Sequence, residues 1–269
     1  MNDSKTIVTD ITSKDKTIPI MEMFGPTIQG EGLMSGTITS FLRTGGCPLR
    51  CEWCDSMHAV DPEQVKENAT RMTTAEILEG FDALAWAPFI TFTGGDPCMH
   101  KGLGDLVPHI NGQGVKVAVE TQGTLFPLWL REVDVVTFSP KPPSSGNIVD
   151  IMPIVKWLTD ARLPHQRVCI KVVIASAEDL EWALDLYEHV PENLIDSFYF
   201  TAVTEMWKAP EDNNPMEASI RVLDTIGGYQ TIAAAILVEA AENGIKFHEK
   251  THVGCQLHVL LWPAEDTGV

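Results

Sequence analysis

Positive charge is scarce in this chain. Its 269 residues carry 19 lysine and arginine side chains against 37 aspartate and glutamate side chains, which gives a formal net charge of −18. A protein this acidic repels phosphate backbones and anionic membrane surfaces, so we expect neither nucleic acid nor a membrane as a direct partner. A small anionic substrate remains compatible with this charge, because a few local cations can bind it.

Long apolar stretches are also missing. No run approaches the roughly 20 apolar residues that a membrane-spanning helix needs. The first twenty residues, MNDSKTIVTDITSKDKTIPI, lack the apolar core of a signal peptide. We therefore expect a cytoplasmic protein in which residues 1–19 form a flexible N-terminal extension and residues 20–269 form a single domain.

Cysteine is sparse and unevenly placed. Cys47, Cys51 and Cys54 form a C-x3-C-x2-C pattern with no fourth cysteine nearby, and three more cysteines are scattered along the chain. Without a secretory signal we expect no disulfide framework. We interpret Cys98 and Cys169 as buried thiols.

Apolar and polar segments alternate along the rest of the chain. The patterns predict strands at 39–43, 89–92, 115–119, 133–138, 167–174 and 197–203, with a short last strand at 245–248. They predict helices at 73–86, 103–110, 150–158 and 177–190, and one or two helices within 215–244, broken at Gly227-Gly228 if there are two. Thr73 and Glu76 form a capping box at the start of the first helix.

This alternation predicts an α/β fold with a parallel sheet. About six strands are too few for an eight-stranded barrel, so we expect a partial, open parallel β/α barrel. The strands are nearly continuous in apolar residues, which predicts a sheet covered on both faces.

Loops with glycine, proline and polar side chains follow four of these strands. They are the cysteine loop after 39–43, TGGDP at 93–97, ETQGT at 120–124 and SPKPPSSG at 139–146. The carboxyl ends of parallel strands meet at one edge, where sheets of this class bind their ligands. The sequence therefore predicts a binding site at that edge.

The cysteine loop has the chemistry of a metal centre. Three thiolates satisfy three of the four irons of a cubane cluster and leave one iron open, as a catalytic centre requires. Gly45 and Gly46 allow the backbone to approach such a cluster closely. Two alternatives remain open: a zinc ion held by the three cysteines and His58, and a non-catalytic iron–sulfur or zinc protein that serves interaction.

The motifs resemble those of a known family. C-x3-C-x2-C is similar to the signature of radical S-adenosylmethionine (SAM) enzymes, and TGGDP resembles their GGE-P motif with Asp96 in place of glutamate. Within that superfamily, several segments resemble 7-carboxy-7-deazaguanine synthases: FGPTIQGEG (24–32), FLRTGGC (41–47), CDS (54–56), ETQGT, SPK and QLHVLLW (256–262). The chain departs from that family at Ser56, where threonine is usual, and at Thr201-Ala202, where many members carry Gln-Pro.

This resemblance implies an activity. The expected enzyme is a radical SAM lyase that converts 6-carboxy-5,6,7,8-tetrahydropterin to 7-carboxy-7-deazaguanine with loss of ammonia, in 7-deazapurine or queuosine-type biosynthesis. It implies a [4Fe-4S] cluster, S-adenosyl-L-methionine and Mg2+ as cofactors, a low-potential electron donor such as a flavodoxin, and a homodimer. A glycyl-radical activase, which shares C-x3-C-x2-C, is the alternative enzyme.

The resemblance also implies roles for individual residues, none of them a protein acid or base. The cluster ligands are Cys47, Cys51 and Cys54, and Ser56 is the Mg2+ ligand. The substrate-binding residues are Ile28, Gln29, Gly30, Glu31, Arg43 and Thr93. The SAM-binding residues are Trp53, Cys54, Asp55, Gly94, Gly95, Asp96, Glu120, Ser139, Pro140 and Lys141. The guanidinium of Arg43 suits the substrate carboxylate because it can bind it with two parallel hydrogen bonds.

Overall fold

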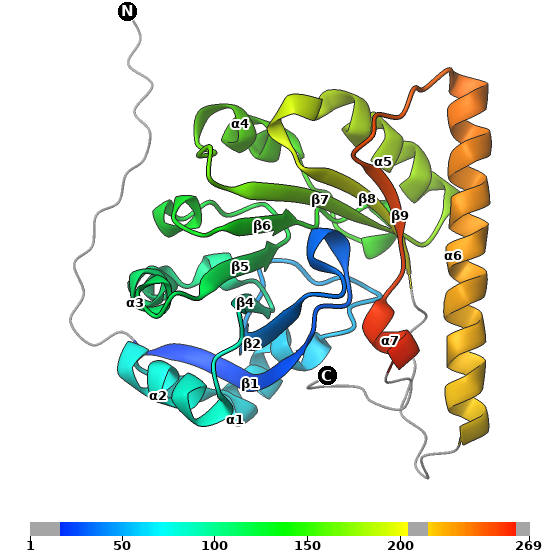
Figure 1. Cartoon of the computed structure of the whole chain (residues 1–269). Helices are drawn as coiled ribbons and strands as arrows, with labels where there is room; N and C mark the ends of the chain where they lie inside the picture. The colour runs from blue at the N-terminus through cyan, green and yellow to red at the C-terminus, as the bar shows by residue number, and fades with distance from the viewer. Residues whose placement is uncertain (1–16, 204–214, 262–269) are drawn as a thin grey trace, which may run out of the picture.

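The computed structural model describes residues 17–203 and 215–261, and within these ranges nine strands form one sheet (Figure 1). The strands are β1 (Ile18–Ile28), β2 (Ile38–Thr44), β3 (Thr70–Met72), β4 (Phe89–Gly94), β5 (Lys116–Thr121), β6 (Val135–Phe138), β7 (Arg167–Ile174), β8 (Ser197–Ala202) and β9 (Thr251–Gly254). Their order is β3-β1-β2-β4-β5-β6-β7-β8-β9. From β2 to β9 every neighbouring pair is parallel, whereas β1 pairs antiparallel with β2 and β3. Because β3 and β9 are free edges of the described sheet, the barrel is open, as predicted.

Helices follow most of the parallel strands. The α-helices of the described ranges are α1 (Pro62–Asn68), α2 (Thr74–Leu84), α3 (Leu106–Gly112), α4 (Met152–Asp160), α5 (Ala177–His189), α6 (Pro215–Asn243) and α7 (Leu257–Leu261), and the short 3-10 helices include Gly32–Met34 after β1. The predicted capping box of α2 is confirmed: Thr73 accepts from the backbone of Glu76, whose side chain accepts from the backbone of Thr73. In Figure 1, α6 stands at one side of the molecule, next to β8 and β9.

The six main predicted strands are confirmed as β2 and β4 to β8, but three details of the prediction are wrong. β1 was not expected, because its Gly25-Pro26 pair is typical of a turn; the strand accommodates the pair with an irregular register between Phe24 and Thr27. β3 was not expected either. The last strand lies at 251–254, where it pairs with β8, and not at 245–248.

Two further expectations concern the ends of the chain. Gly227-Gly228 does not break α6, which runs continuously, since a glycine inside a helix costs only about 1 kcal/mol. The predicted extension over residues 1–19 lies outside the described residues except at its end, where Ile18 already begins β1.

The two faces of the sheet differ in polarity. On one face, Leu42, Phe92, Val119, Phe138 and Ile170 are fully buried in a core that they share with α2 to α5. The residues next to them point to the opposite face because side chains alternate along a strand. These residues are Arg43, Thr93, Glu120, Thr137 and Lys171, so the opposite face is polar. A polar face is where a site can form.

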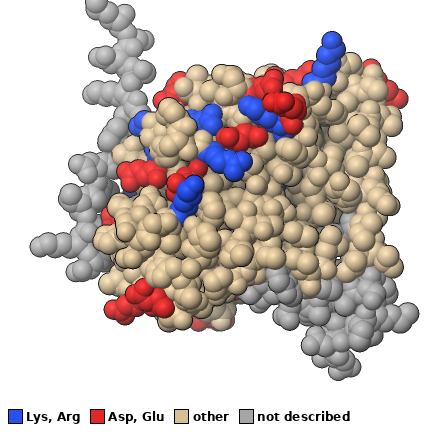
Figure 2. Space-filling view, viewed as in Figure 1, with Lys and Arg blue, Asp and Glu red and all other residues tan. Residues whose placement is uncertain are grey.

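The outer surface carries mixed charge. Figure 2 shows lysine and arginine side chains next to aspartate and glutamate side chains on the face that it presents. Within residues 17–203 and 215–261, no helix combines the length and the apolar character that a bilayer span requires.

Candidate active site

The three clustered cysteines lie on the loop that leaves β2. Cys51 is buried, with 8% of its surface exposed, and Cys47 and Cys54 are half-buried. The backbone N–H of Cys54 donates to the carbonyl of Cys51 over 3.3 Å, and the side-chain amide of Asn147 donates to the Cys51 sulfur over 3.5 Å. One short loop therefore presents three thiols to the same end of the sheet.

The burial of these thiols affects their protonation. Burial raises the pKa of Cys47 and of Cys54 to about 11, so a bound cationic metal is needed to convert them to thiolates at neutral pH. In the described part of the chain, no three histidine, cysteine, aspartate or glutamate side chains are arranged to hold one metal ion. His58 faces Glu22, 3.4 Å away, so the structure gives no support to a Cys3His zinc site.

The TGGDP segment packs directly against the cysteine loop. A Cβ atom on Gly95 would lie 2.1 Å from the carbonyl oxygen of Gly46, so only glycine fits there. Gly94 has a φ of +135°, a conformation that side chains rarely adopt, and a Cβ on it would meet the backbone of Thr44. The two loops therefore form one tightly packed unit at the ends of β2 and β4.

Asp96 holds this unit to β5. Its side chain is fully buried, and its carboxylate accepts hydrogen bonds from the Thr121 hydroxyl at 3.0 Å and from the backbone N–H of Cys98 at 2.9 Å. Burial raises the pKa of this carboxyl. The side chain is thus engaged inside the protein, and the predicted contact of Asp96 with SAM would use its backbone.

Arg43 lies on the polar face beside two other candidates. It pairs in register with Thr93 on β4, and its Nη1 donates to the Ser56 hydroxyl over 3.3 Å. Its Nε forms an ion pair with Glu22 at 2.5 Å. Sequence reasoning missed Glu22, which lies within a strand that was not predicted.

Glu22 already supplies Arg43 with one negative partner. Burial would raise the pKa of Glu22, but its contacts with His58 and Arg43 hold that pKa below its usual value. Because a guanidinium has five N–H donors in a planar fork, Arg43 can bind Glu22 through Nε and still offer donors to a ligand.

A second cluster joins residues of the QGEG segment to the middle of the sheet. The Gln29 amide donates to Glu120 over 2.9 Å. Lys171 on β7 forms ion pairs with Glu31 and, at 3.8 Å, with Glu120. Sequence reasoning missed Lys171, although the signal was present: it is the one charge inside the apolar stretch VCIKVVI.

Charges in this cluster stabilise one another. Burial would raise the pKa of Glu31, but Lys171 and His258 lower it to about 2. Burial would lower the pKa of Lys171, but Glu120 and Glu31 raise it above its usual value. Glu31 and Lys171 are therefore both charged at neutral pH, and two carboxylates facing one ammonium leave a formal charge of −1.

The C-terminal segment covers the QGEG loop. The backbone N–H of Leu257, at the start of α7, donates to the carbonyl of Gly30 over 2.9 Å. A Cβ on Gly30 would lie 2.1 Å from His258 Nδ1, so glycine is needed for this close approach. Ile28, the last residue of β1, pairs with Ile38 and leads into this loop. The end of the predicted QLHVLLW motif, Trp262, lies outside the described residues.

The SPK segment follows β6 and approaches the cysteine loop. Ser139 is buried, as is Pro140, and the ammonium of Lys141 donates to the Ser139 hydroxyl over 3.1 Å. The same ammonium lies 5.7 Å from the centre of the Trp53 ring. Trp53 donates from its indole N–H to Ser144, so it is held against this segment. Asp55 is exposed and accepts from the Ser56 hydroxyl at 3.0 Å.

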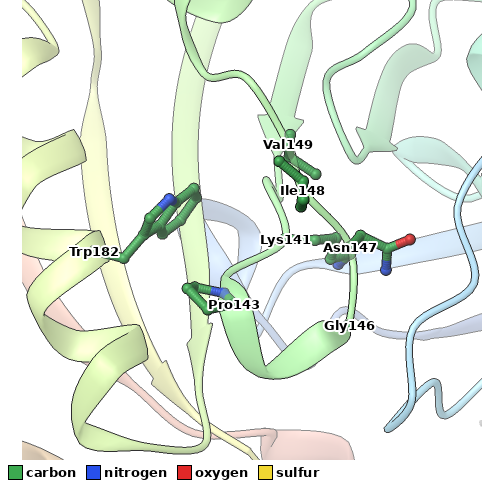
Figure 3. A pocket seen from close by; sticks show the side chains of 7 residues that line it. All are labelled: Lys141, Pro143, Gly146, Asn147, Ile148, Val149 and Trp182. Atoms are coloured by element: carbon green, nitrogen blue, oxygen red, sulfur yellow. The ribbon is translucent and has the colours of Figure 1, made fainter.

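A pocket of about 360 Å3 lies beside this segment (Figure 3). Trp182 projects from α5 on one side, opposite the stretch that carries Ile148 and Val149. The full lining is Lys141, Pro143, Gly146, Asn147, Ile148, Val149 and Trp182. Asn147 lines the pocket and also contacts Cys51, so the pocket lies next to the cysteine loop. Gln29 and Glu31 are not among the lining residues.

The structure thus brings the predicted residues into two groups on one polar face. One group surrounds the cysteine loop and contains Arg43, Trp53 to Ser56, Thr93 to Asp96 and Ser139 to Lys141. The other joins Gln29, Glu31 and Glu120 through Lys171. The roles of the individual residues remain predictions.

Comparison with known proteins identifies relatives of this chain. The model of the Radical SAM superfamily matches residues 41–140. The 7-carboxy-7-deazaguanine synthase of Bacillus subtilis is 33% identical over 251 residues, which cover 92% of this chain and 97% of that protein. The protein of the same name from Bacillus cereus is 36% identical over 177 residues, covering 65% of this chain and 73% of that protein.

Solved structures agree on the fold. QueE from Escherichia coli superimposes with a TM-score of 0.55 at 23% identity, covering 70% of this chain and 83% of that one. SuiB from Streptococcus suis, bound to the precursor peptide SuiA, gives a TM-score of 0.54 at 14% identity and covers 82% of this chain and 49% of that one. At these identities the likeness concerns the fold alone.

Proposed function

The chain belongs to the 7-carboxy-7-deazaguanine synthase family of the Radical SAM superfamily, and we propose that it performs the reaction for which its relatives are named. It converts 6-carboxy-5,6,7,8-tetrahydropterin to 7-carboxy-7-deazaguanine with loss of ammonia. The observation that carries this proposal is the similarity to the Bacillus subtilis enzyme over nearly the full length of both chains. The shared name of the relatives argues against an activase and against a non-catalytic metal protein.

The superfamily uses a [4Fe-4S] cluster and SAM, and the residues present fit both. Cys47, Cys51 and Cys54 would hold the cluster. Gly94 and Gly95 would let the backbone approach SAM, and Trp53 to Asp55, Asp96, Glu120 and Ser139 to Lys141 would surround it. When bound, the cluster and SAM supply the radical that starts the reaction, and the protein contributes position and charge.

Substrate binding falls to the two polar groups. Arg43 would bind the pterin carboxylate through the guanidinium donors that Glu22 leaves available, with Thr93 beside it. Ile28, Gln29, Gly30 and Glu31 would meet the N–H donors and acceptors along the pterin ring. These residues are far apart in the sequence, but neighbouring strands bring them to the same polar face of the sheet.

Ser56 would contribute to a Mg2+ site. A hydroxyl is a hard, neutral oxygen ligand, and Mg2+ keeps near-octahedral oxygen geometry with few protein ligands. The Ser56 hydroxyl contacts Arg43 and the carboxylate of Asp55. Substrate oxygens and water would complete the shell, so the ion would orient the substrate rather than activate a nucleophile.

The remaining partners follow from the family. A low-potential electron donor such as a flavodoxin would reduce the cluster, and a second copy of the chain would form a homodimer. The apolar side chains that α6 exposes, Leu223, Leu237 and Val238, would be buried in that dimer. The cytoplasmic location expected from the N-terminal sequence stays a prediction.

One anaerobic assay tests the proposed function. The cluster-loaded protein is incubated with reductant, SAM and 6-carboxy-5,6,7,8-tetrahydropterin, and we expect 7-carboxy-7-deazaguanine and one ammonia per turnover by mass spectrometry. A cluster-loaded protein that cleaves SAM but leaves the pterin intact would refute the proposal.

Cysteine variants test the cluster ligands in the same preparation. Replacement of Cys47, Cys51 or Cys54 by alanine should abolish iron retention and product, because no other thiol lies on this loop. Cys98→Ala is the matched control: this buried thiol lies outside the loop, so iron content should stay near that of the wild type. Iron lost from Cys98→Ala would overturn the ligand assignment.

A further inference from the structure

Lys171 is a charge in a place where charges are rare. Its side chain is only 6% exposed, on a central strand whose neighbouring residues are buried. A buried ammonium is tolerated only when carboxylates compensate for the lost water, and an apolar residue of similar volume often serves stability as well or better. A fold that needed only packing at this position would not need lysine.

Its partners come from two distant segments. Lys171 contacts Glu31, which lies 140 positions earlier in the loop after β1, and Glu120 at the end of β5. Glu120 also accepts from Gln29. Lys171 therefore joins both glutamates that face the site, and Gln29 belongs to the same network.

We infer that Lys171 is a positioning residue, which holds Glu31 as a hydrogen-bond acceptor for the N–H donors of the pterin's guanidine-like edge and fixes Glu120 between that edge and SAM. This inference rests on the proposed function. The ammonium keeps the two carboxylates from repelling each other, and the remaining formal charge of −1 complements the several N–H donors of that edge. The substrate's own carboxylate would lie at the other group, near Arg43.

Several titratable groups lie around Lys171 and affect how binding depends on pH. The titratable groups that face Lys171 and Glu31 are Glu120, Asp55, His258, Cys169, Tyr199 and Cys255. Without Lys171, burial would still raise the pKa of Glu31, but its principal cationic partner would be gone. Glu31 would then take up a proton as the pH falls, and a protonated carboxyl is a poorer acceptor.

The experiment replaces Lys171 by methionine and by glutamine in the cluster-loaded, SAM-bound enzyme. Two quantities are measured from pH 6 to pH 9: the KM for the carboxylated tetrahydropterin, and the affinity for unreactive 6-carboxypterin by calorimetry. We expect the ratio of variant KM to wild-type KM to exceed tenfold near neutral pH and to fall as the pH rises, because Glu31 loses its proton again. SAM affinity should change less than pterin affinity.

Two controls accompany these variants. Lys156→Met makes the same substitution at an exposed lysine that pairs with Asp160 on α4, and it should leave both quantities unchanged. Lys171→Arg keeps the charge, so its KM ratio should not depend on pH. Circular dichroism and iron content verify that each variant is folded and loaded.

Several results would overturn the inference. One is a pterin affinity within twofold of the wild type in both neutral variants, and another is a pH-independent loss that affects SAM equally. Neutral variants that only unfold, beside a Lys171→Arg enzyme with wild-type KM, would assign Lys171 a structural role alone. In each case the wild type would still turn over the pterin, whereas a failure of the proposed function would remove wild-type turnover itself.

Discussion

At the scale of single residues, the polar face works through charges that are already paired before any ligand arrives. Arg43 has Glu22, and Lys171 has Glu31 and Glu120. Such internal partners fix the direction of long side chains and reduce the conformational entropy that binding would otherwise cost. Replacing one member of a pair therefore also leaves its partner without a counter-charge.

Arg43→Ala should weaken binding of the carboxylated pterin. Removal of one partner of a desolvated charge pair costs roughly 2–5 kcal/mol, and about 2 kcal/mol corresponds to roughly a 30-fold higher KM. The KM for SAM should change little. Steady-state kinetics with both substrates checks this, and Glu22→Gln is the matched variant, since it keeps Arg43 and should have a smaller effect. An unchanged pterin KM in Arg43→Ala would remove this residue from the site.

Ser56 should make turnover depend on Mg2+. In metal-stripped enzyme, added Mg2+ should raise the rate for the wild type and for Ser56→Thr, because both provide a hydroxyl, and should have little effect on Ser56→Ala. The readout is product formation with and without Mg2+ at constant cluster absorbance. Equal rates with and without Mg2+ in the stripped wild type would show that Ser56 only contacts Asp55 and Arg43.

At the scale of elements, the site depends on two loops that touch through their backbones. Gly95 and Gly46 approach so closely that there is no room for a side chain on Gly95. The backbone N–H of Asp96 donates to the carbonyl of Gly46 over 2.7 Å, which adds a direct hydrogen bond between them. The positions of the cysteines are thus set by the end of β4 as well as by their own loop.

Gly95→Ala should therefore separate the two loops. The added Cβ would lie 2.1 Å from a backbone oxygen that cannot rotate away, so we expect a lower melting temperature and reduced iron retention. Gly112→Ala is the matched control, because a Cβ there meets nothing within 4 Å. Thermal unfolding by circular dichroism and iron analysis measure both effects. A Gly95→Ala protein with normal iron content would contradict the proposed dependence.

At the scale of the whole molecule, the polar face is enclosed by elements from both ends of the chain. The loop after β1 lies against β7 and β8, and α7 lies against Gly30. On the outside, α6 exposes leucine and valine side chains; Leu237 is 67% exposed and Val238 is 56% exposed. These are the side chains that the proposed dimer would bury.

The dimer prediction can be tested on α6. The wild type should sediment as a dimer at micromolar concentration, and Leu237→Glu should shift it toward the monomer, because a buried unpaired charge is costly in an interface. Leu128→Glu is the control: Leu128 is 56% exposed but belongs to the 3-10 helix Leu128–Arg131 and not to α6. Sedimentation velocity distinguishes the two states. Identical sedimentation of wild type and Leu237→Glu would exclude this face as the interface.

The sequence by itself determined the local features of this protein. The spacing of the three cysteines, the capping box at Thr73, the six main strands and the glycine-rich loops at their ends depend on residues close together in the chain. Such patterns follow from short-range geometry, namely the alternation of strand side chains and the conformational freedom of glycine. The family resemblance rested on these same short motifs, and the comparison with relatives confirmed it.

Only the tertiary structure decided which distant charges meet. Glu22 reaches Arg43 because β1 pairs antiparallel with β2, and Glu31 reaches Lys171 because the loop after β1 crosses to β7. The Gly25-Pro26 pair is typical of a turn, so the sequence did not predict β1. Because the neighbours of Lys171 are apolar, the sequence predicted a strand that is covered on both faces. Sheet order and strand register determine these contacts, and both depend on packing across the whole chain rather than on any local pattern.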